Sequence, residues 1–200
     1  MAKRYVRRSC VCGIGVCNEP SMSIPAKLLA KYYERAVQTV RQAGMRAGEV
    51  AVLLPIFSEI RTSEFMDIWE ASYPRYEDCV FDFHLRQSFG TYWSMKTLER
   101  HMEAAAARAT LLKSIPMCCV GEWSLALPSR AIVGCDKQEL RGIYERFARL
   151  QLEAFETATH GWFFWSWKSS AGLPWSLRDL LRKRVLAVPS HGRLADAAKP

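Results

Sequence analysis

The chain has 200 residues, of which 50% are hydrophobic and 24% charged, an ordinary globular composition with enough length for one domain and a buried core. No apolar stretch reaches the length of a transmembrane helix, so no membrane span is expected. The formal net charge of +8 leaves a nucleic-acid partner as a secondary hypothesis, which no recognition motif supports.

The first predicted strand is Ser9–Pro20, a short apolar run that contains glycine and is stopped by proline. Basic residues precede it, as in a secretory signal, but the run leads into Asn18-Glu19-Pro20 without a small-residue cleavage site. We therefore expect a strand, and localisation stays open. Alternation puts four residues on one face of this strand: Gly13, Gly15, Cys17 and Glu19. Small residues on that face suit the interior of a barrel.

Helices and strands alternate along the rest of the chain. Four further strands are expected, at Glu49–Pro55, Cys79–Leu85, Ile115–Gly121 and Trp162–Trp167. Helical segments are expected at Ser23–Gly44, Ser63–Ala71, Ser94–Ser114, Lys137–Thr159 (capped by Asp136) and Ser176–Arg184. A turn is expected at Tyr73–Asp78, and residues 189–200 are expected to form a flexible tail.

This alternation predicts an α/β fold with a parallel sheet and crossover helices, either an open sheet or a (β/α)8 barrel. No Gly-x-Gly-x-x-Gly or Walker loop follows a strand, which disfavours a nucleotide-binding open sheet. We therefore expect a (β/α)8 barrel. It would be incomplete, because the chain supplies five strand–helix units and closure needs eight.

Glu19 and Glu122 each stand at the C-terminal end of a predicted strand, three strand–helix units apart. The C-terminal ends of barrel strands carry the active site, and hydrolysis of a glycosidic bond needs two carboxyl groups. One protonates the leaving oxygen, while the other attacks the anomeric carbon or activates water. A solvated glutamate after a strand remains the simpler interpretation of Glu122 alone.

Alternation also assigns faces to two of the central strands. One face of the third strand carries Val80, Asp82, His84 and Arg86, and one face of the fourth carries Pro116, Cys118, Val120 and Glu122.

Four further side chains are candidates for binding a sugar. Asn18 stands beside Glu19, and His84 stands on the facing strand, so both can hydrogen-bond either substrate hydroxyl groups or the two carboxylates. Trp165 and Trp167 share a strand face with Phe163 and offer flat surfaces on which a sugar ring stacks. Each residue has a plainer interpretation as a packed core side chain.

The chain has seven cysteines, an odd number, and none forms a Cys-x-x-Cys pair. They include Cys10, Cys12 and Cys17 near the N-terminus and the adjacent pair Cys118 and Cys119. We interpret them as reduced core residues, and no metal site is expected.

Four segments carry a family resemblance in their order along the chain: Asn18-Glu19-Pro20, the His84 strand, Gly121-Glu122-Trp123-Ser124, and the aromatic run 161–168 (Gly-Trp-Phe-Phe-Trp-Ser-Trp-Lys). They resemble glycoside hydrolase family 5, and more narrowly its exo-β-1,3-glucanases (glucan 1,3-β-glucosidases). The Asn-Glu-Pro motif is widespread among barrel glycosidases, whereas the two Trp-containing motifs are more particular. The similarity extends from about Tyr5 to Trp175.

The resemblance implies a retaining mechanism on a β-glucan substrate, with no metal or organic cofactor. Glu19 matches the acid/base and Glu122 the nucleophile. Asn18 matches the residue that binds the sugar 2-hydroxyl, and His84 a substrate-binding histidine. Trp165 or Trp167 matches the aromatic platform of the sugar subsite, with Trp167 favoured.

Two departures from the family accompany this match. Arg86 stands where the family has a tyrosine, and Tyr92 is a candidate aromatic substitute from the following loop. Residues 1–188 would form only units four to eight of the barrel, so units one to three would be missing. The family is mostly secreted.

Open barrel edges would need a partner or a missing segment to cover them. The alternative function is a non-catalytic remnant that binds sugar or a partner protein through the aromatic strand. The nucleic-acid hypothesis rests on charge alone, and no nucleic acid is expected.

Overall fold

The computed structural model describes residues 1–56, 59–72 and 76–187. Its centre is one parallel sheet of five strands whose spatial order, β1-β2-β3-β4-β5, follows the chain. The strands are β1 (Gly13–Gly15), β2 (Ala51–Pro55), β3 (Cys79–His84), β4 (Cys118–Trp123) and β5 (Trp162–Phe164). The predicted tail, 189–200, and the first half of the predicted turn at 73–78 lie outside the described residues.

Helices connect successive strands. The α-helices are α1 (Ala2–Tyr5), α2 (Ala26–Gln42), α3 (Thr62–Ser72), α4 (Gly90–Ser94), α5 (Leu98–Lys113), α6 (Lys137–Phe155) and α7 (Leu177–Arg182). Three short 3-10 helices lie at Glu59–Arg61, Ser129–Ile132 and Leu173–Trp175. Within the described ranges, no helix combines the length and apolar character needed to cross a bilayer.

Local sequence signals set the ends of the longer helices. Asp136 caps α6 by accepting from the backbone N–H of Glu139, and the Glu139 side chain accepts from the Asp136 N–H in return. This capping box confirms the predicted start of α6. Helix α5 begins later than predicted, because Thr97 caps it by accepting from the Arg100 N–H.

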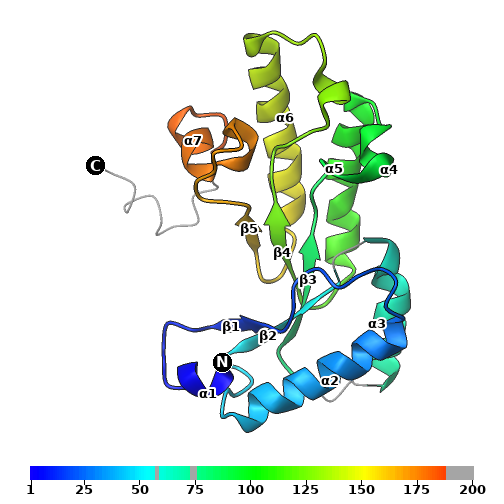
Figure 1. Cartoon of the computed structure of the whole chain (residues 1–200), viewed down its shortest axis with the longest axis vertical. Coiled ribbons are helices and arrows are strands. Elements are labelled where there is room, and N and C mark those ends of the chain that lie inside the picture. Colours follow the sequence, from blue (N-terminus) through cyan, green and yellow to red (C-terminus); the bar gives the residue numbers. More distant parts are fainter. Residues whose placement is uncertain (57–58, 73–75, 188–200) are drawn as a thin grey trace.

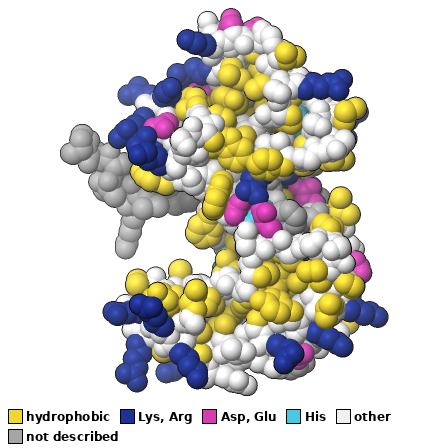
Figure 2. Space-filling view, viewed as in Figure 1, with side chains coloured by type: hydrophobic (Ala, Val, Ile, Leu, Met, Phe, Trp, Pro, Cys, Tyr) yellow, Lys and Arg dark blue, Asp and Glu magenta, His cyan; other side chains and the backbone are white. Residues whose placement is uncertain are grey.

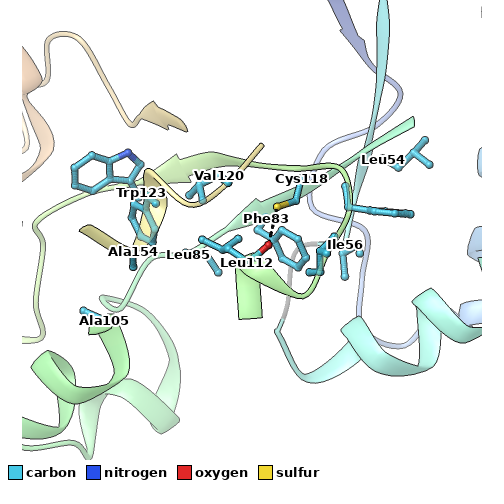
Figure 3. Close-up of a cluster of buried hydrophobic side chains, with 14 of the residues drawn as sticks. Leu54, Ile56, Phe83, Leu85, Ala105, Leu112, Cys118, Val120, Trp123 and Ala154 are labelled. Carbon is cyan, nitrogen blue, oxygen red and sulfur yellow. Dashed lines mark hydrogen bonds between the residues drawn. The ribbon is translucent and has the colours of Figure 1, made fainter. Parts of the chain in front are cut away.

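The sheet curls, and the long helices cover its convex side while the other side stays open (Figure 1). Side chains of β2, β3 and β4 that face the helices form one buried core with residues of α2, α3, α5 and α6 (Figure 3). Phe83, Val120 and Trp123 have no exposed surface. The core therefore lies between sheet and helices, as in one half of a (β/α)8 barrel.

One predicted strand face is wrong. Cys118 Sγ points to the Leu112 carbonyl of α5, whereas Cys119 Sγ lies 3.6 Å from Asp82 Oδ1 on the concave side. The register of β4 is irregular next to both of its neighbouring strands, between Phe83 and His84 and between Val120 and Trp123. This bulge turns Glu122 to the concave side, so it does not share a face with Cys118 and Val120.

The two outer strands are shorter than predicted. The strand expected at Ser9–Pro20 is regular only over Gly13–Gly15, and the one expected at Trp162–Trp167 only over Trp162–Phe164. Each pairs with one neighbour in the described sheet, so fewer backbone bonds hold it extended. Cys10 and Cys12 are exposed, which contradicts their interpretation as core residues, while Cys79, Cys118 and Cys119 are buried as expected.

A hollow of about 1130 Å³ lies beside β1 and α2. Its lining is largely apolar and includes Ile14, Val16, Leu28 and Tyr32. Leu28 is 58% exposed and Tyr32 47%, although both stand on a helix that packs against the sheet. The described part of the molecule thus leaves an apolar surface uncovered next to its first strand.

Candidate active site

Glu122 lies near the carboxyl end of β4 and is 9% exposed. The preceding Gly121 makes this placement possible, because a Cβ at that position would overlap the Asp82 carboxylate of β3. The strand is anchored immediately after Glu122 by Trp123, whose ring packs edge-to-face on Phe155, Trp162 and Phe164. Glu122 is therefore held on a rigid, buried part of the sheet.

Glu19 lies on the loop after β1, and its backbone has a left-handed φ of 37°. L-residues rarely adopt this region, and such strained residues cluster at functional sites. The Glu19 side chain is 29% exposed, against 12% for that of Glu122. The carboxylates of Glu19 and Glu122 thus differ in their exposure to solvent.

His84, at the end of β3, joins them. Its Nδ1 lies 2.8 Å from Glu19 Oε1 and 3.7 Å from Glu122 Oε1. Its Nε2 lies 3.7 Å from Asp82 Oδ2, deeper on the concave side of the sheet. The histidine therefore lies among three carboxylates, and its side chain is only 4% exposed.

Arg86, two residues further along, bridges the two glutamates. Its Nη1 donates to Glu122 Oε2 at 2.5 Å, and its Nη2 donates to Glu19 Oε1. The guanidinium carbon also lies 5.5 Å from the centre of the Phe89 ring. Acidic, basic and histidine side chains gather in the hollow between the two halves of the molecule (Figure 2).

The cluster shifts the proton affinity of two of its members. Burial disfavours the charged imidazole, but the interactions with Asp82 and Glu19 outweigh it and raise the pKa of His84. Burial also raises the pKa of Glu122, and the nearby charges of His84 and Arg86 oppose that shift. His84 is therefore more readily protonated than a free histidine, and Glu122 more readily than a free glutamate.

Three residues of this cluster have metal-ligand chemistry. Glu19, His84 and Glu122 each offer a ligand atom, and these atoms all lie within 4.8 Å of one another. Arg86 binds oxygens of both glutamates and places a fixed positive charge beside them. The absence of a metal site remains a prediction.

The remaining predicted site residues are exposed: Asn18, Tyr92, Trp165 and Trp167. Asn18 is exposed on the loop that carries Glu19, while Trp165 is 51% and Trp167 62% exposed beyond the end of β5. The Trp165 backbone N–H donates to the Trp123 carbonyl, which places it next to the Glu122 strand. Tyr92, on α4, packs against Trp93. Among the described residues, no hydrogen bond links these four side chains to Glu19, His84 or Glu122.

Sequence reasoning missed the structural role of Arg86. Its position two residues after His84 indicates the same side of the strand, but an arginine beyond a strand end is usually solvated. Asp82 was also assigned only to a face, although its buried carboxylate lies beneath His84. Asp82 and Arg86 stand two residues before and two residues after His84, and this spacing was the sequence signal that all three side chains lie on one side of the strand.

A curled parallel sheet with crossover helices and carboxylates at the strand ends defines the class: an incomplete (β/α)8 barrel with an acidic cluster at its carboxyl edge. The crystal structure of rutinosidase from Aspergillus niger superposes with a TM-score of 0.55 at 17% identity, covering 80% of this chain and 43% of that one. The crystal structure of AoRut gives the same TM-score, at 18% identity and with 80% and 42% covered. The predicted fold is confirmed.

Sequence comparison then identifies the relatives. The chain is 25% identical to "Glucan 1,3-beta-glucosidase" of Schwanniomyces occidentalis over 216 residues, which is 92% of this chain and 49% of the relative. It is 26% identical to "Probable glucan 1,3-beta-glucosidase A" of Neosartorya fischeri over 231 residues, 96% of this chain and 52% of the relative. No protein-family model matches.

These matches confirm the resemblance: the chain is similar in sequence, over more than nine-tenths of its length, to proteins named glucan 1,3-beta-glucosidase. It spans about half the length of the curated relatives it matches.

Proposed function

We propose that this chain carries the catalytic carboxylates of a retaining glycoside hydrolase that acts on β-glucan. The observation that carries the proposal is the proximity of Glu19 and Glu122, whose nearest carboxylate oxygens lie within 4.8 Å of each other. Retaining glycosidases hold their carboxyl groups about 5–5.5 Å apart, whereas inverting enzymes need about 6.5–9.5 Å for a water. The spacing supports a covalent intermediate over direct attack by water.

In this proposal Glu122 is the nucleophile that bonds to the anomeric carbon, and Glu19 is the acid/base. Glu19 gives a proton to the leaving oxygen and later takes one from the attacking water. The location of Glu122 on a buried strand suits a nucleophile that must be held in place. Glu19 is nearer solvent, where protons and water exchange.

The other predicted binding residues complete the sugar site. Asn18 and His84 would hydrogen-bond hydroxyl groups of the substrate, and Trp165 or Trp167 would provide the aromatic platform. The exposure of both Trp rings leaves their faces available for a sugar. The choice of β-1,3-glucan as substrate rests on the names of the relatives.

The apolar hollow beside β1 bears on how this site is completed. A closed barrel would place another strand–helix unit against that edge. We therefore include in the proposal a covering segment or partner chain that pairs with β1 and packs on Leu28 and Tyr32.

A second function is favoured by one specific observation. Arg86 binds both carboxylates, which leaves the pair engaged in ion pairs in the described state. A sugar-binding remnant without turnover would tolerate that arrangement. Binding of laminarin without hydrolysis would support this alternative.

The direct test is hydrolysis of laminarin or of an aryl β-glucoside. Glu122→Gln and Glu19→Gln should each lower kcat by at least about a hundredfold, because each removes a group that acts in the transition state. Glu145→Gln is the matched control, since that glutamate is exposed and pairs with Arg141 on α6. Loss of activity in the control alone, or full activity in both site variants, would reject the assignment.

Azide rescue separates the two roles. With Glu122→Ala, azide should attack the substrate directly and give the α-glycosyl azide. With Glu19→Ala, azide should attack the covalent intermediate and give the β-glycosyl azide. The anomeric configuration by NMR thus assigns nucleophile and acid/base independently of rates.

A further inference from the structure

Arg86 is the feature of the site that the proposed mechanism does not use. Both glutamates accept from its guanidinium, and its side chain is only 15% exposed. The planar fork of a guanidinium matches carboxylate oxygens better than any other cation in proteins. The Arg86 guanidinium is therefore held by hydrogen bonds to both carboxylates.

The position of the guanidinium conflicts with that of a substrate. Retaining hydrolysis places the anomeric carbon against the Glu122 carboxylate and the glycosidic oxygen against the Glu19 carboxylate. Those are the two carboxylates that Arg86 joins, through Glu122 Oε2 and Glu19 Oε1. A sugar and the guanidinium cannot both lie between them.

Phe89 gives Arg86 a contact that does not depend on the carboxylates. The guanidinium already lies over the ring of Phe89, which is 59% exposed, on the loop before α4. Movement outward along that ring keeps a cation–π contact while releasing the carboxylates. Release of the two carboxylates would therefore leave the guanidinium with one of its present contacts.

We propose that Arg86 is an internal competitor of the substrate: it occupies the space between Glu19 and Glu122 and must leave both carboxylates before a sugar binds. This inference rests on the proposed function, because a sugar must bind between the two glutamates for Arg86 to compete with it. It makes Arg86 a positioning residue that sets apparent affinity.

The consequence is a measurable loss of affinity. When only a fraction of molecules is open, the apparent dissociation constant is the intrinsic one divided by that fraction. Removing the guanidinium should therefore tighten binding, by about tenfold if one molecule in ten is open. The rate of the bound complex should change less than KM.

The test compares Arg86→Met, which keeps side-chain length without charge, with Arg86→Lys, whose single ammonium cannot span both carboxylates as a fork. Arg100→Met is the control, because Arg100 pairs with Glu103 on the exposed face of α5. The probe is 1-deoxynojirimycin, whose protonated amine binds carboxylates, followed by calorimetry. KM and kcat for an aryl β-glucoside are measured alongside.

The expected result is a dissociation constant about tenfold lower in Arg86→Met, an intermediate value in Arg86→Lys and no change in the control. Equal or weaker binding in both Arg86 variants would overturn the inference, because Arg86 would then be a ligand of the sugar or a structural residue. If Arg86→Met does not fold, Arg86→Lys alone decides by the same criterion.

The two proposals fail differently. Tighter binding of the probe without hydrolysis in any variant would reject the hydrolase while keeping the competitor. Hydrolysis by the wild type with unchanged or weaker binding in the variants would keep the hydrolase and reject the competitor.

Discussion

The two glutamates stand on unlike regions of one sheet. The β4 region is a six-residue strand flanked on both sides, in which Cys118, Val120 and Trp123 have no exposed surface. The β1 region is a three-residue strand at the edge of the described sheet, partly exposed and bordered by the apolar hollow. One carboxylate is thus carried by a buried central strand and the other by the loop after a partly exposed edge strand.

The two glutamates of the site are therefore held in place to different degrees. Glu122 is fixed by the packing around it, whereas Glu19 is held mainly by its bonds to His84 and Arg86. Perturbing the β4 region should therefore cost global stability. Perturbing the β1 region should cost little stability and act on the site or on association.

The largest effect is expected from Trp123→Ala. Removing a fully buried aromatic side chain costs about 3–5 kcal/mol of unfolding free energy. Phe163→Ala, on the neighbouring strand but 59% exposed, should cost less than about 1 kcal/mol. Urea denaturation followed by circular dichroism measures both. Equal costs would contradict the packing described around β4.

A glycine pair gives the next contrast. Gly121→Ala forces a methyl group into the Asp82 carboxylate and should destabilise the fold by about 1–3 kcal/mol. Gly15→Ala on β1 meets no atom within 4 Å, and should be neutral or stabilise by up to about 1 kcal/mol. Thermal and urea unfolding of the two variants test the pair. A Gly15→Ala cost as large as that of Gly121→Ala would remove the contrast.

His84 predicts a pH dependence. Its pKa is raised in the folded state, against burial, by Asp82 and Glu19, so its contribution is complete below the unfolded value of about 6.5. The contribution is lost as pH rises through the folded pKa. The urea midpoint of the wild type should therefore fall towards that of His84→Gln between neutral and alkaline pH. His160→Gln, at an exposed histidine, is the control. A difference in urea midpoint between the wild type and His84→Gln that grows as pH rises would contradict the prediction.

The smallest change in stability is expected from Leu28→Ser on α2. Leu28 is 58% exposed, so its replacement should alter the unfolding free energy by less than about 0.5 kcal/mol. Because it lines the apolar hollow, the same substitution should reduce self-association in sedimentation velocity. Leu29→Ser, at 3% exposure on the same helix, is the contrasting variant and should unfold the protein more easily.

The regular features of the fold were predictable from the sequence. The alternation of apolar runs and helical periodicity identified the five strands in their order, and Asp136 marked the start of α6. Glu19, His84 and Glu122 were predicted as site residues, and the structure brings them together. Short-range pattern was sufficient because parallel sheets with crossover helices repeat one local unit.

The failures come from contacts between distant residues. The bulge in β4 depends on packing against both neighbours, so simple alternation assigned Glu122 to the wrong face. Arg86 binds glutamates 67 and 36 residues away, and its spacing from His84 indicates its side of the strand but not those partners. Cys10 and Cys12 resemble strand residues, but the regular edge strand begins only at Gly13, after both of them.

The strand order has a consequence for synthesis. Each strand of the sheet pairs with the one that leaves the ribosome just before it, so no strand must be inserted between two others. The sheet can grow by addition at a single edge while translation continues. That growing edge carries unpaired backbone groups at every stage. The open edge to which each new strand is added is therefore also the edge at which two nascent chains on one polysome would pair by mistake.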